Sequence, residues 1–336
     1  MTFRRVALSS VMLASSLASS LACNPDPEPS EGWQEVFEGL DSALLSIWGR
    51  GPDDVWVVGS DVGAGPELLH FDGAAWTRMS TGQSANLWWV SGIDDEIWMA
   101  GEQGLIVRHD RSAGSFEAAT TPEPVTLFGI LPLASDDVWA VGGDLEAGRG
   151  VVWHYDGTAW TEDAETTPLL TEGVLYKIWG ERSDRLFAVG AGGTNLIRTA
   201  DGWAAAPVPV DRNLFTVHGS GEHVVAVGGF IDGLLVEWDG SAWVDATPAG
   251  APQLNGVWVE ADGSAMAVGV EGSIWRRSVD GAWAADDSID KLFYDFHSAY
   301  VDPSGGMWAV GGFVIAAPFD RGMLYHHGDA LPTTIE

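Results

Sequence analysis

Seven ring-bearing side chains recur along the chain and are the strongest candidates for contacting a ligand. They are Trp48, Trp89, Phe128, Trp179, His218, Trp258 and Tyr300. Flat rings gathered at one opening would stack on sugar faces or hold a hydrophobic peptide. The preceding residue is often apolar too, as at Ile47 and Ile178, and two consecutive apolar positions are typical of a strand buried on both faces. Two interpretations therefore stay open, ligand contact and internal packing.

The polar residues give little indication of catalysis. A glycosidase of the sialidase type requires clustered arginines for the substrate carboxylate and a Tyr/Glu nucleophile pair. Beyond Arg276-Arg277, the arginines that follow the N-terminal pair are scattered, and no Ser/His/Asp order or phosphate-binding Gly loop stands out. We expect a non-catalytic protein with no catalytic residue and no cofactor. A sialidase-like glycosidase or a lyase is the third hypothesis.

Acidic pairs and one histidine pair are the candidates for metal ligands. Asp53-Asp54 and Asp136-Asp137 could bind Ca²⁺ through carboxylate oxygens, but they lack the alternating Asp spacing of a dedicated calcium loop. His326-His327 are adjacent, a spacing that does not face one ion. We assign no metal site and expect turn or capping roles, with Ca²⁺ binding as the alternative.

A second repeated position is basic in an otherwise acidic chain. It holds His70, Arg108, His154, Arg198, Glu237, Arg276 and Tyr325. We expect these residues on a half-exposed strand, where each cation meets a neighbouring acidic turn and contributes no more than about 1 kcal/mol.

All these positions belong to a repeat whose marker is an apolar phrase ending in glycine. The phrase "VWVVG" ends at Gly59, and similar phrases end at Gly101, Gly142, Gly190, Gly228, Gly269 and Gly311. We expect each glycine to supply a positive φ where a strand turns sharply. A period of about 40 residues with four strand-length stretches is typical of a β-propeller. The sequence therefore predicts an all-β fold, a seven-bladed β-propeller with four antiparallel strands per blade.

Asp-Gly dipeptides join the third and fourth stretches of five repeats. They begin at Asp72, Asp156, Asp201, Asp239 and Asp280 and favour a two-residue hairpin turn. A tryptophan follows in each case, at Trp76, Trp160, Trp203, Trp243 and Trp283, which we interpret as a structural lid on the outer strand.

This DGxxW element resembles the Asp-box of sialidase-type propellers. The whole repeat is similar to the WD-repeat-like and Asp-box-like propeller superfamily, and to propeller lipoproteins of myxobacteria that repeat "IWG…DDVWAVG…DGxxW". The resemblance covers residues 32 to 328 and implies a fold, not an activity.

The seventh repeat needs an outer strand from elsewhere. Leu331 falls in its tryptophan position, and Pro332 weakens strand pairing. Residues 31 to 39, "EGWQEVFEG", are therefore predicted to supply the outer strand of blade seven, so that an N-terminal strand closes the ring.

The N-terminus indicates export. Residues 1 to 22 combine a basic start with a short apolar stretch, as in a signal peptide. Cys23, the single cysteine, follows "SLA" and makes the segment resemble a bacterial lipoprotein signal, which implies acylation of Cys23. Cleavage that leaves Cys23 unmodified is the alternative. Residues 23 to 31 are predicted to be a Pro-rich acidic spacer, and residues 32 to 336 the propeller.

Charge narrows the range of partners. The formal net charge of −32 should repel nucleic acid and anionic lipid head groups. We predict an exported, lipid-anchored monomer that acts as a binding or assembly scaffold at the bacterial cell envelope, on the outer membrane, with periplasmic or secreted alternatives. Its partner would be an envelope protein or a glycan, and a lectin-like propeller is the second hypothesis.

Overall fold

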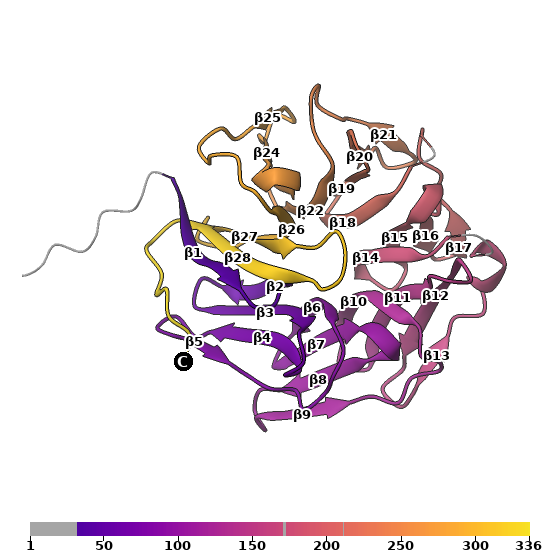
Figure 1. Ribbon diagram of the computed structural model, residues 1–336. Coiled ribbons are helices and arrows are strands. Elements are labelled where there is room, and N and C mark those ends of the chain that lie inside the picture. Colours follow the sequence, from indigo (N-terminus) through magenta and orange to yellow (C-terminus); the bar gives the residue numbers. More distant parts are fainter. Residues whose placement is uncertain (1–31, 171–172, 211) are drawn as a thin grey trace, which may run out of the picture.

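The computed structural model describes residues 32–170, 173–210 and 212–336. These residues form seven four-stranded antiparallel sheets, arranged as blades around a central axis (Figure 1). The predicted all-β class, the blade number and the strand count per blade are confirmed. The predicted signal peptide, Cys23 and the spacer through residue 31 lie outside the described residues. Helix in the described part is limited to three-residue 3-10 turns, and none of them is long enough to cross a membrane.

Blades 1 to 3 each run from an inner first strand to an outer fourth strand. Blade 1 contains β2 (Leu44–Gly51), β3 (Asp54–Asp61), β4 (Pro66–Phe71) and β5 (Trp76–Arg78). Blade 2 contains β6 (Leu87–Ile93), β7 (Glu96–Gly101), β8 (Ile106–Asp110) and β9 (Ser115–Ala118), with η1 (Glu102–Gly104). Blade 3 contains β10 (Thr126–Ala134), β11 (Asp137–Asp144), β12 (Arg149–Tyr155) and β13 (Trp160–Glu162), followed by η2 (Thr167–Leu169).

Blades 4 to 7 repeat this order, except that blade 7 takes its outer strand from the N-terminus. Blade 4 contains β14 (Leu175–Arg182), β15 (Arg185–Gly190), η3 (Ala191–Gly193), β16 (Leu196–Thr199) and β17 (Gly202–Ala205). Blade 5 contains β18 (Leu214–Ser220), β19 (His223–Gly229), β20 (Gly233–Trp238) and β21 (Trp243–Asp245). Blade 6 contains β22 (Leu254–Val259), β23 (Ala265–Gly269), η4 (Val270–Gly272), β24 (Ile274–Arg277) and β25 (Trp283–Ala285). Blade 7 contains β26 (Asp295–Val301), β27 (Met307–Phe313), β28 (Asp320–His327) and β1 (Trp33–Leu40).

The glycine that marks each repeat is needed for a close backbone approach. None of the seven has a φ in the left-handed region, and Gly101 and Gly190 are extended at −159° and −163°. A Cβ atom on Gly142 would lie 2.0 Å from the carbonyl oxygen of Thr126, at the start of the same blade's first strand. The other six glycines meet the equivalent oxygen at 1.9 to 2.2 Å. The expectation of a positive φ is therefore wrong, although the spacing that it helped to identify is real.

In the five blades that have one, the outer tryptophan contacts the blade before it. The rings of Trp76 in β5 and Trp308 in β27 have centroids 6.3 Å apart, and those of Trp160 in β13 and Trp98 in β7 are 6.1 Å apart. The equivalent pairs are Trp203 with Trp139 and Trp243 with Phe187. These contacts confirm the predicted structural role of the outer tryptophans.

The N-terminal strand closes the ring as predicted. β1 pairs antiparallel with β28, from Trp33 opposite His327 to Leu40 opposite Gly322. The indigo and yellow strands lie side by side in Figure 1. Phe37 of β1 is buried in a hydrophobic cluster shared by blades 7 and 1.

The C-terminal tail makes a second contact across the same junction. The Glu336 amide donates to the carbonyl of Trp76 at 2.8 Å, and the Arg78 amide donates to the carbonyl of Glu336 at 3.1 Å. Leu331 and Ile335 pack on the cluster that contains Phe37. The sequence placed Leu331 at the outer edge of blade 7, but β1 occupies that edge, so the tail crosses to blade 1.

Four of the five Asp-Gly loops are longer than the predicted two-residue turn; in blade 4, Thr199 pairs with Gly202 and leaves two residues in the loop. Phe71 pairs with Trp76, which leaves residues 72–75 in the loop, and the loops after Tyr155 and Trp238 have the same length. The Asp72 carboxylate accepts hydrogen bonds from the amides of Ala74 and Ala75, both at 2.9 Å. These bonds form an Asx turn and lower the pKa of Asp72. Gly73 does take the expected positive φ, 90°.

Candidate functional site

A β-bulge near the start of each first strand directs one extra side chain toward the axis of the propeller. The bulged residues are Leu45, Trp88, Phe128, Tyr176, Phe215, Asn255 and His297 in blades 1 to 7. Bulges re-aim side chains in this way and are frequent beside functional sites. All except Leu45 line one cavity of about 530 Å³. We call this cavity, with its six bulged residues, the aromatic funnel.

Four rings form an arc along the wall of the funnel from blade 2 to blade 5. The centroids of Trp88 and Phe128 are 5.3 Å apart, those of Phe128 and Tyr176 5.5 Å, and those of Tyr176 and Phe215 5.7 Å. The first two contacts are edge-to-face and the third is tilted. Such contacts fix the ring orientations. The wall is therefore a preformed apolar surface.

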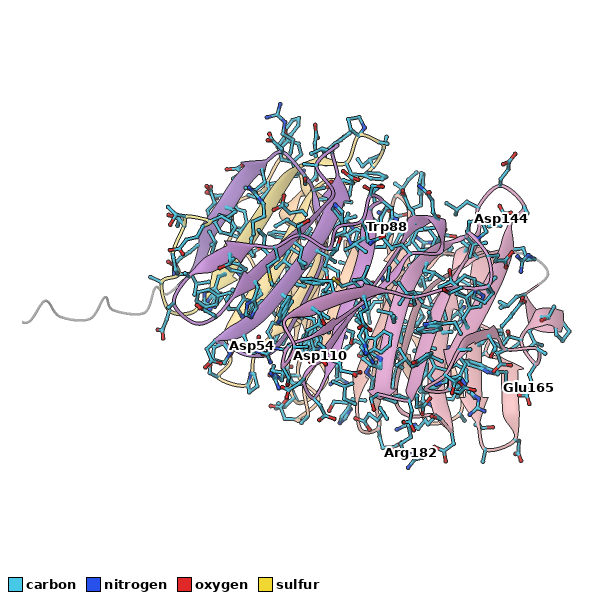
Figure 2. All side chains as sticks on the ribbon, turned by 90° about the horizontal axis from the view of Figure 1, so that it is seen from below. Asp54, Trp88, Asp110, Asp144, Glu165 and Arg182 are labelled. Carbon is cyan, nitrogen blue, oxygen red and sulfur yellow. The ribbon has the colours of Figure 1, made fainter. Side chains whose placement is uncertain are left out.

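The funnel opens on one face of the disc. In Figure 2, Trp88 lies toward the same face as Asp144, which ends β11, whereas Asp54, Asp110 and Arg182 lie toward the opposite face. The strand connections that surround the funnel are therefore those between the second and third strands of a blade and those between consecutive blades.

Apolar side chains extend from two of these connections. Phe230, between β19 and β20, is 77% exposed, and Ile315, between β27 and β28, is also 77% exposed. Both line the funnel, together with Val314. Ile231, beside Phe230, is 81% exposed. Large apolar side chains grouped over an aromatic cavity are typical of a surface that binds a partner.

A buried lysine lies at the floor of the funnel. Lys177 follows the bulge in β14 and is 4% exposed. Its Nζ donates to the carbonyl of Phe128 at 2.7 Å and lies 3.5 Å from the centroid of the Trp89 ring. No carboxylate of the described residues forms an ion pair with it. Burial lowers the pKa of Lys177 well below its usual range.

Polar groups occupy the wall formed by blades 5 to 7. Thr216 Oγ1 donates to the Asn255 carbonyl at 2.6 Å, and Gln253 Nε2 donates to Asn255 Oδ1 at 2.9 Å. His297 Nδ1 lies 2.5 Å from the Leu45 carbonyl, which can only accept, so this nitrogen carries the proton. Burial and the charge of Lys177 lower the pKa of His297 to about 4, so the imidazole is neutral at neutral pH.

Five of the seven predicted ligand-contacting residues lie at the other end of the first strands. Trp48, Trp179, His218, Trp258 and Tyr300 all pair with the large position of the second strand, as Trp48 does with Trp56. His218 stacks on Trp258 at 4.1 Å, and Trp258 meets Tyr300 edge-to-face at 4.9 Å. Tyr300 is 1% exposed. These rings contact one another from blade to blade, as the packing interpretation expected.

These aromatic rings also pack closely against glycines of the neighbouring blade. A Cβ atom on Gly92 would meet the Trp48 ring at 2.5 Å, and one on Gly219 would meet the Trp179 ring at 2.7 Å. Each ring therefore fills the space left by a glycine on the next blade. Whether these five residues also contact a ligand stays a prediction.

Trp89 and Phe128 do not share the predicted position. Ser91 and Leu131 occupy it in blades 2 and 3. Trp89 instead lies against Lys177, and Phe128 is the one predicted residue that lines the funnel. The sequence signal for the funnel is a leucine followed by an aromatic residue at the start of the first strand, as in Leu87-Trp88 and Leu214-Phe215.

Acidic residues of the strand turns accept hydrogen bonds from other side chains of the blades. Asp54 accepts hydrogen bonds from Trp56 Nε1 at 3.0 Å, His70 Nε2 at 2.9 Å and Arg50 Nε at 3.0 Å. Burial raises the pKa of Asp54, but the hydrogen bonds from His70, Arg50 and Trp56 lower it by more, so its pKa lies below the usual value. In the described part of the chain, no group of three or more His, Cys, Asp or Glu side chains is placed to hold a metal ion.

The repeated basic position forms most of the expected ion pairs. His154 Nε2 lies 2.8 Å from Asp137, Arg108 lies 3.3 Å from Glu96, and Arg276 lies 3.5 Å from Asp286. The exception is Arg198, whose guanidinium lies 5.1 Å from the centroid of the Trp139 ring. The pairs of His154 and Arg108 join the second and third strands of their blades, whereas that of Arg276 joins β24 to the segment after β25.

Comparison with known proteins identifies the fold. No model of a known protein family and no curated protein matches the sequence. A structure of YCF48 bound to D1 peptide is similar, with a TM-score of 0.67 and 14% identity over 90% of this chain and 98% of that one. The WD40 repeats of RRP9 give 0.67 and 10% over 89% and 98%. The extracellular domain of the hybrid two component system BT4673 from B. thetaiotaomicron gives 0.65 and 14% over 88% of this chain and 39% of that one. The chain is therefore a seven-bladed β-propeller with WD40-like structural neighbours.

Proposed function

We propose that this chain is a non-catalytic binding protein that captures an apolar peptide segment of an envelope partner in the aromatic funnel. The observation that carries the proposal is the exposed rim formed by Phe230, Ile231 and Ile315 above the aromatic arc. Exposed apolar side chains are costly in water unless a partner covers them. The cavity volume of about 530 Å³ is within the usual range for a site that takes a few side chains.

A peptide fits this surface better than a sugar. Sugar binding uses open ring faces together with several polar groups around the ring. Here neighbouring rings such as Trp88 and Phe128 meet at an interplanar angle of 63°, and the rim is aliphatic as well as aromatic. A YCF48 structure bound to D1 peptide shares the architecture at low identity, which supports a peptide as a ligand type for such a propeller.

Envelope localisation is part of the proposal. The predicted signal peptide, acylation at Cys23 and the spacer through residue 31 would attach the propeller to a membrane and let the disc stand off from it. The sequence contains no recognisable catalytic motif, and binding without catalysis or a cofactor is part of the proposal.

A peptide array and a glycan array probed with the full chain test the proposal. The chain should bind a subset of apolar peptides, and a Phe230→Ser, Ile315→Ser double variant should lose that binding while melting normally. Val279→Ser is the matched control, because Val279 is 65% exposed but does not line the funnel. Binding to glycans alone would replace the proposal with the lectin hypothesis. Equal peptide binding by the double variant would move the site away from the funnel.

A further inference from the structure

The unusual group in the funnel is Lys177. It is one of only two lysines in a chain with a formal net charge of −32, and it lies buried at the floor of an apolar cavity. Buried cations in proteins are normally paired with an anion, because removing a charge from water is costly. An ammonium group has three donors. The neighbours that its Nζ is seen to meet are one carbonyl, that of Phe128, and the Trp89 ring.

We propose that the funnel binds a peptide by its C-terminal carboxylate, with Lys177 as the counter-ion and the aromatic arc around the last side chains. This inference rests on the proposed function and specifies its ligand. A bound carboxylate would favour the charged form of Lys177, which burial alone disfavours. It would accept hydrogen bonds from Nζ donors that the Phe128 carbonyl does not use. Trp88, Phe128, Tyr176 and Phe215 would cover the apolar side chains next to it.

A chain end suits the shape of the site. At the level of Lys177, most first strands present small side chains, and Trp89 and Lys177 are the large ones and contact each other. The equivalent small residues are Ser46, Gly129, Thr216, Gly256 and Ser298. A peptide end can reach Lys177 at the floor of the funnel directly, whereas an internal Asp or Glu would require the chain to enter and return.

The other ionisable groups of the funnel are compatible with an incoming carboxylate. His297 is neutral, because burial and the charge of Lys177 depress its pKa. Asp295 also lines the funnel, but its Oδ1 accepts a hydrogen bond from the Glu271 amide at 2.8 Å and it lies at the start of β26. Burial raises the pKa of Asp295 above its usual value.

The experiment uses the full chain and pairs of short fluorescent peptides that differ only at the C-terminus, as free acid or amide. The peptides carry apolar residues at the last three positions. A charge-assisted hydrogen bond predicts that amidation weakens binding about tenfold to a hundredfold. Lys177→Met should weaken binding of the acid by a similar factor and leave binding of the amide unchanged. Lys291→Met, at the other lysine, is the control, because Lys291 is 70% exposed and lies outside the funnel.

The outcomes separate this inference from the proposed function. If acids and amides bind equally and Phe230→Ser, Ile315→Ser abolishes both, the funnel is a peptide site and the carboxylate inference is overturned. A third set of peptides, amidated and carrying one internal Glu, tests the chain end: if these bind through Lys177 and the free acids do not, the assignment to a chain end is overturned. If no peptide binds in either form, the proposed function fails as well. The comparison of acid and amide peptides uses the unchanged protein, so it remains valid even if Lys177→Met alters folding.

Discussion

Replacing Phe37 by alanine tests how the propeller is closed. Phe37 is 6% exposed in β1, and its ring meets Trp76 of blade 1 edge-to-face at a centroid distance of 5.4 Å. It thus links the outer strand of blade 7 to the next blade. Truncating a buried phenylalanine costs about 3 to 5 kcal/mol, because apolar burial is lost and a cavity remains. At roughly 2 °C per kcal/mol for a chain of this size, Tm should fall by about 6 to 10 °C.

Thermal melts followed by circular dichroism measure this effect. Glu38→Ala is the matched control, because Glu38 is the next residue of β1 and is exposed, so its Tm should change by no more than about 1 °C. A Phe37→Ala variant that melts with the wild type would refute the reasoning, since β1 could then contribute little to closure. Loss of the Phe37 contact with an early, separate transition would instead show that β1 detaches before the blades unfold.

Three further predictions concern the buried lysine, a repeat glycine and the C-terminal tail. Lys177→Met should stabilise the protein at pH 7, because burial lowers the pKa of Lys177 and the unfolded chain then binds a proton that the folded protein does not readily bind. The gain in stability over the wild type should shrink as the pH rises toward 10, where the unfolded chain loses that proton too. A pH-independent difference between the two proteins in urea melts would contradict this prediction. Gly142→Ala should lower the free energy of unfolding by about 3 kcal/mol or more, because its Cβ would lie 2.0 Å from a carbonyl oxygen. Gly148→Ala should lower it by about 1 to 2 kcal/mol, because Gly148 has a φ of 66° but open space around it. Equal losses in chemical denaturation would show that the blades tolerate a side chain at Gly142. The double variant Leu331→Ala, Ile335→Ala should lower the free energy of unfolding by about 2 kcal/mol, because both side chains pack on the cluster between blades 7 and 1. Thr333→Ala, Thr334→Ala is the control, because both threonines are exposed. Matching melts of the two double variants would exclude a stabilising role for the tail.

Much of the fold can be predicted from the sequence because one backbone requirement recurs in every blade. The second strand approaches the start of the first so closely that only glycine fits, as at Gly142. That requirement preserves a glycine spacing which counts the blades. The physical reason was nevertheless misassigned, because sequence alone does not separate a glycine chosen for positive φ from one chosen for space.

The site was harder to predict because of the bulges. A single extra residue near the start of each first strand reverses which side chains face the channel, so Trp88 and Tyr176 line the funnel while Trp48 and Trp179 pack between blades. Lys177 gives no signal of burial in its own segment. Lys177 is buried because the closed ring brings the first strands of all seven blades together, and a local sequence pattern does not reveal such a long-range arrangement.

The most direct test of the binding site uses ¹⁹F NMR on protein labelled with 5-fluorotryptophan. The 18 tryptophans include Trp88 in the funnel wall, Trp89 against Lys177, and Trp48 and Trp258 at the other end of the first strands. Resonances are assigned by single Trp→Phe variants, and the protein is titrated with a peptide that binds on the array. The proposed site predicts that the Trp88 and Trp89 signals shift while those of Trp48 and Trp258 do not. Shifts at Trp48 and Trp258 with Trp88 unchanged would contradict it and place the ligand at the opposite mouth.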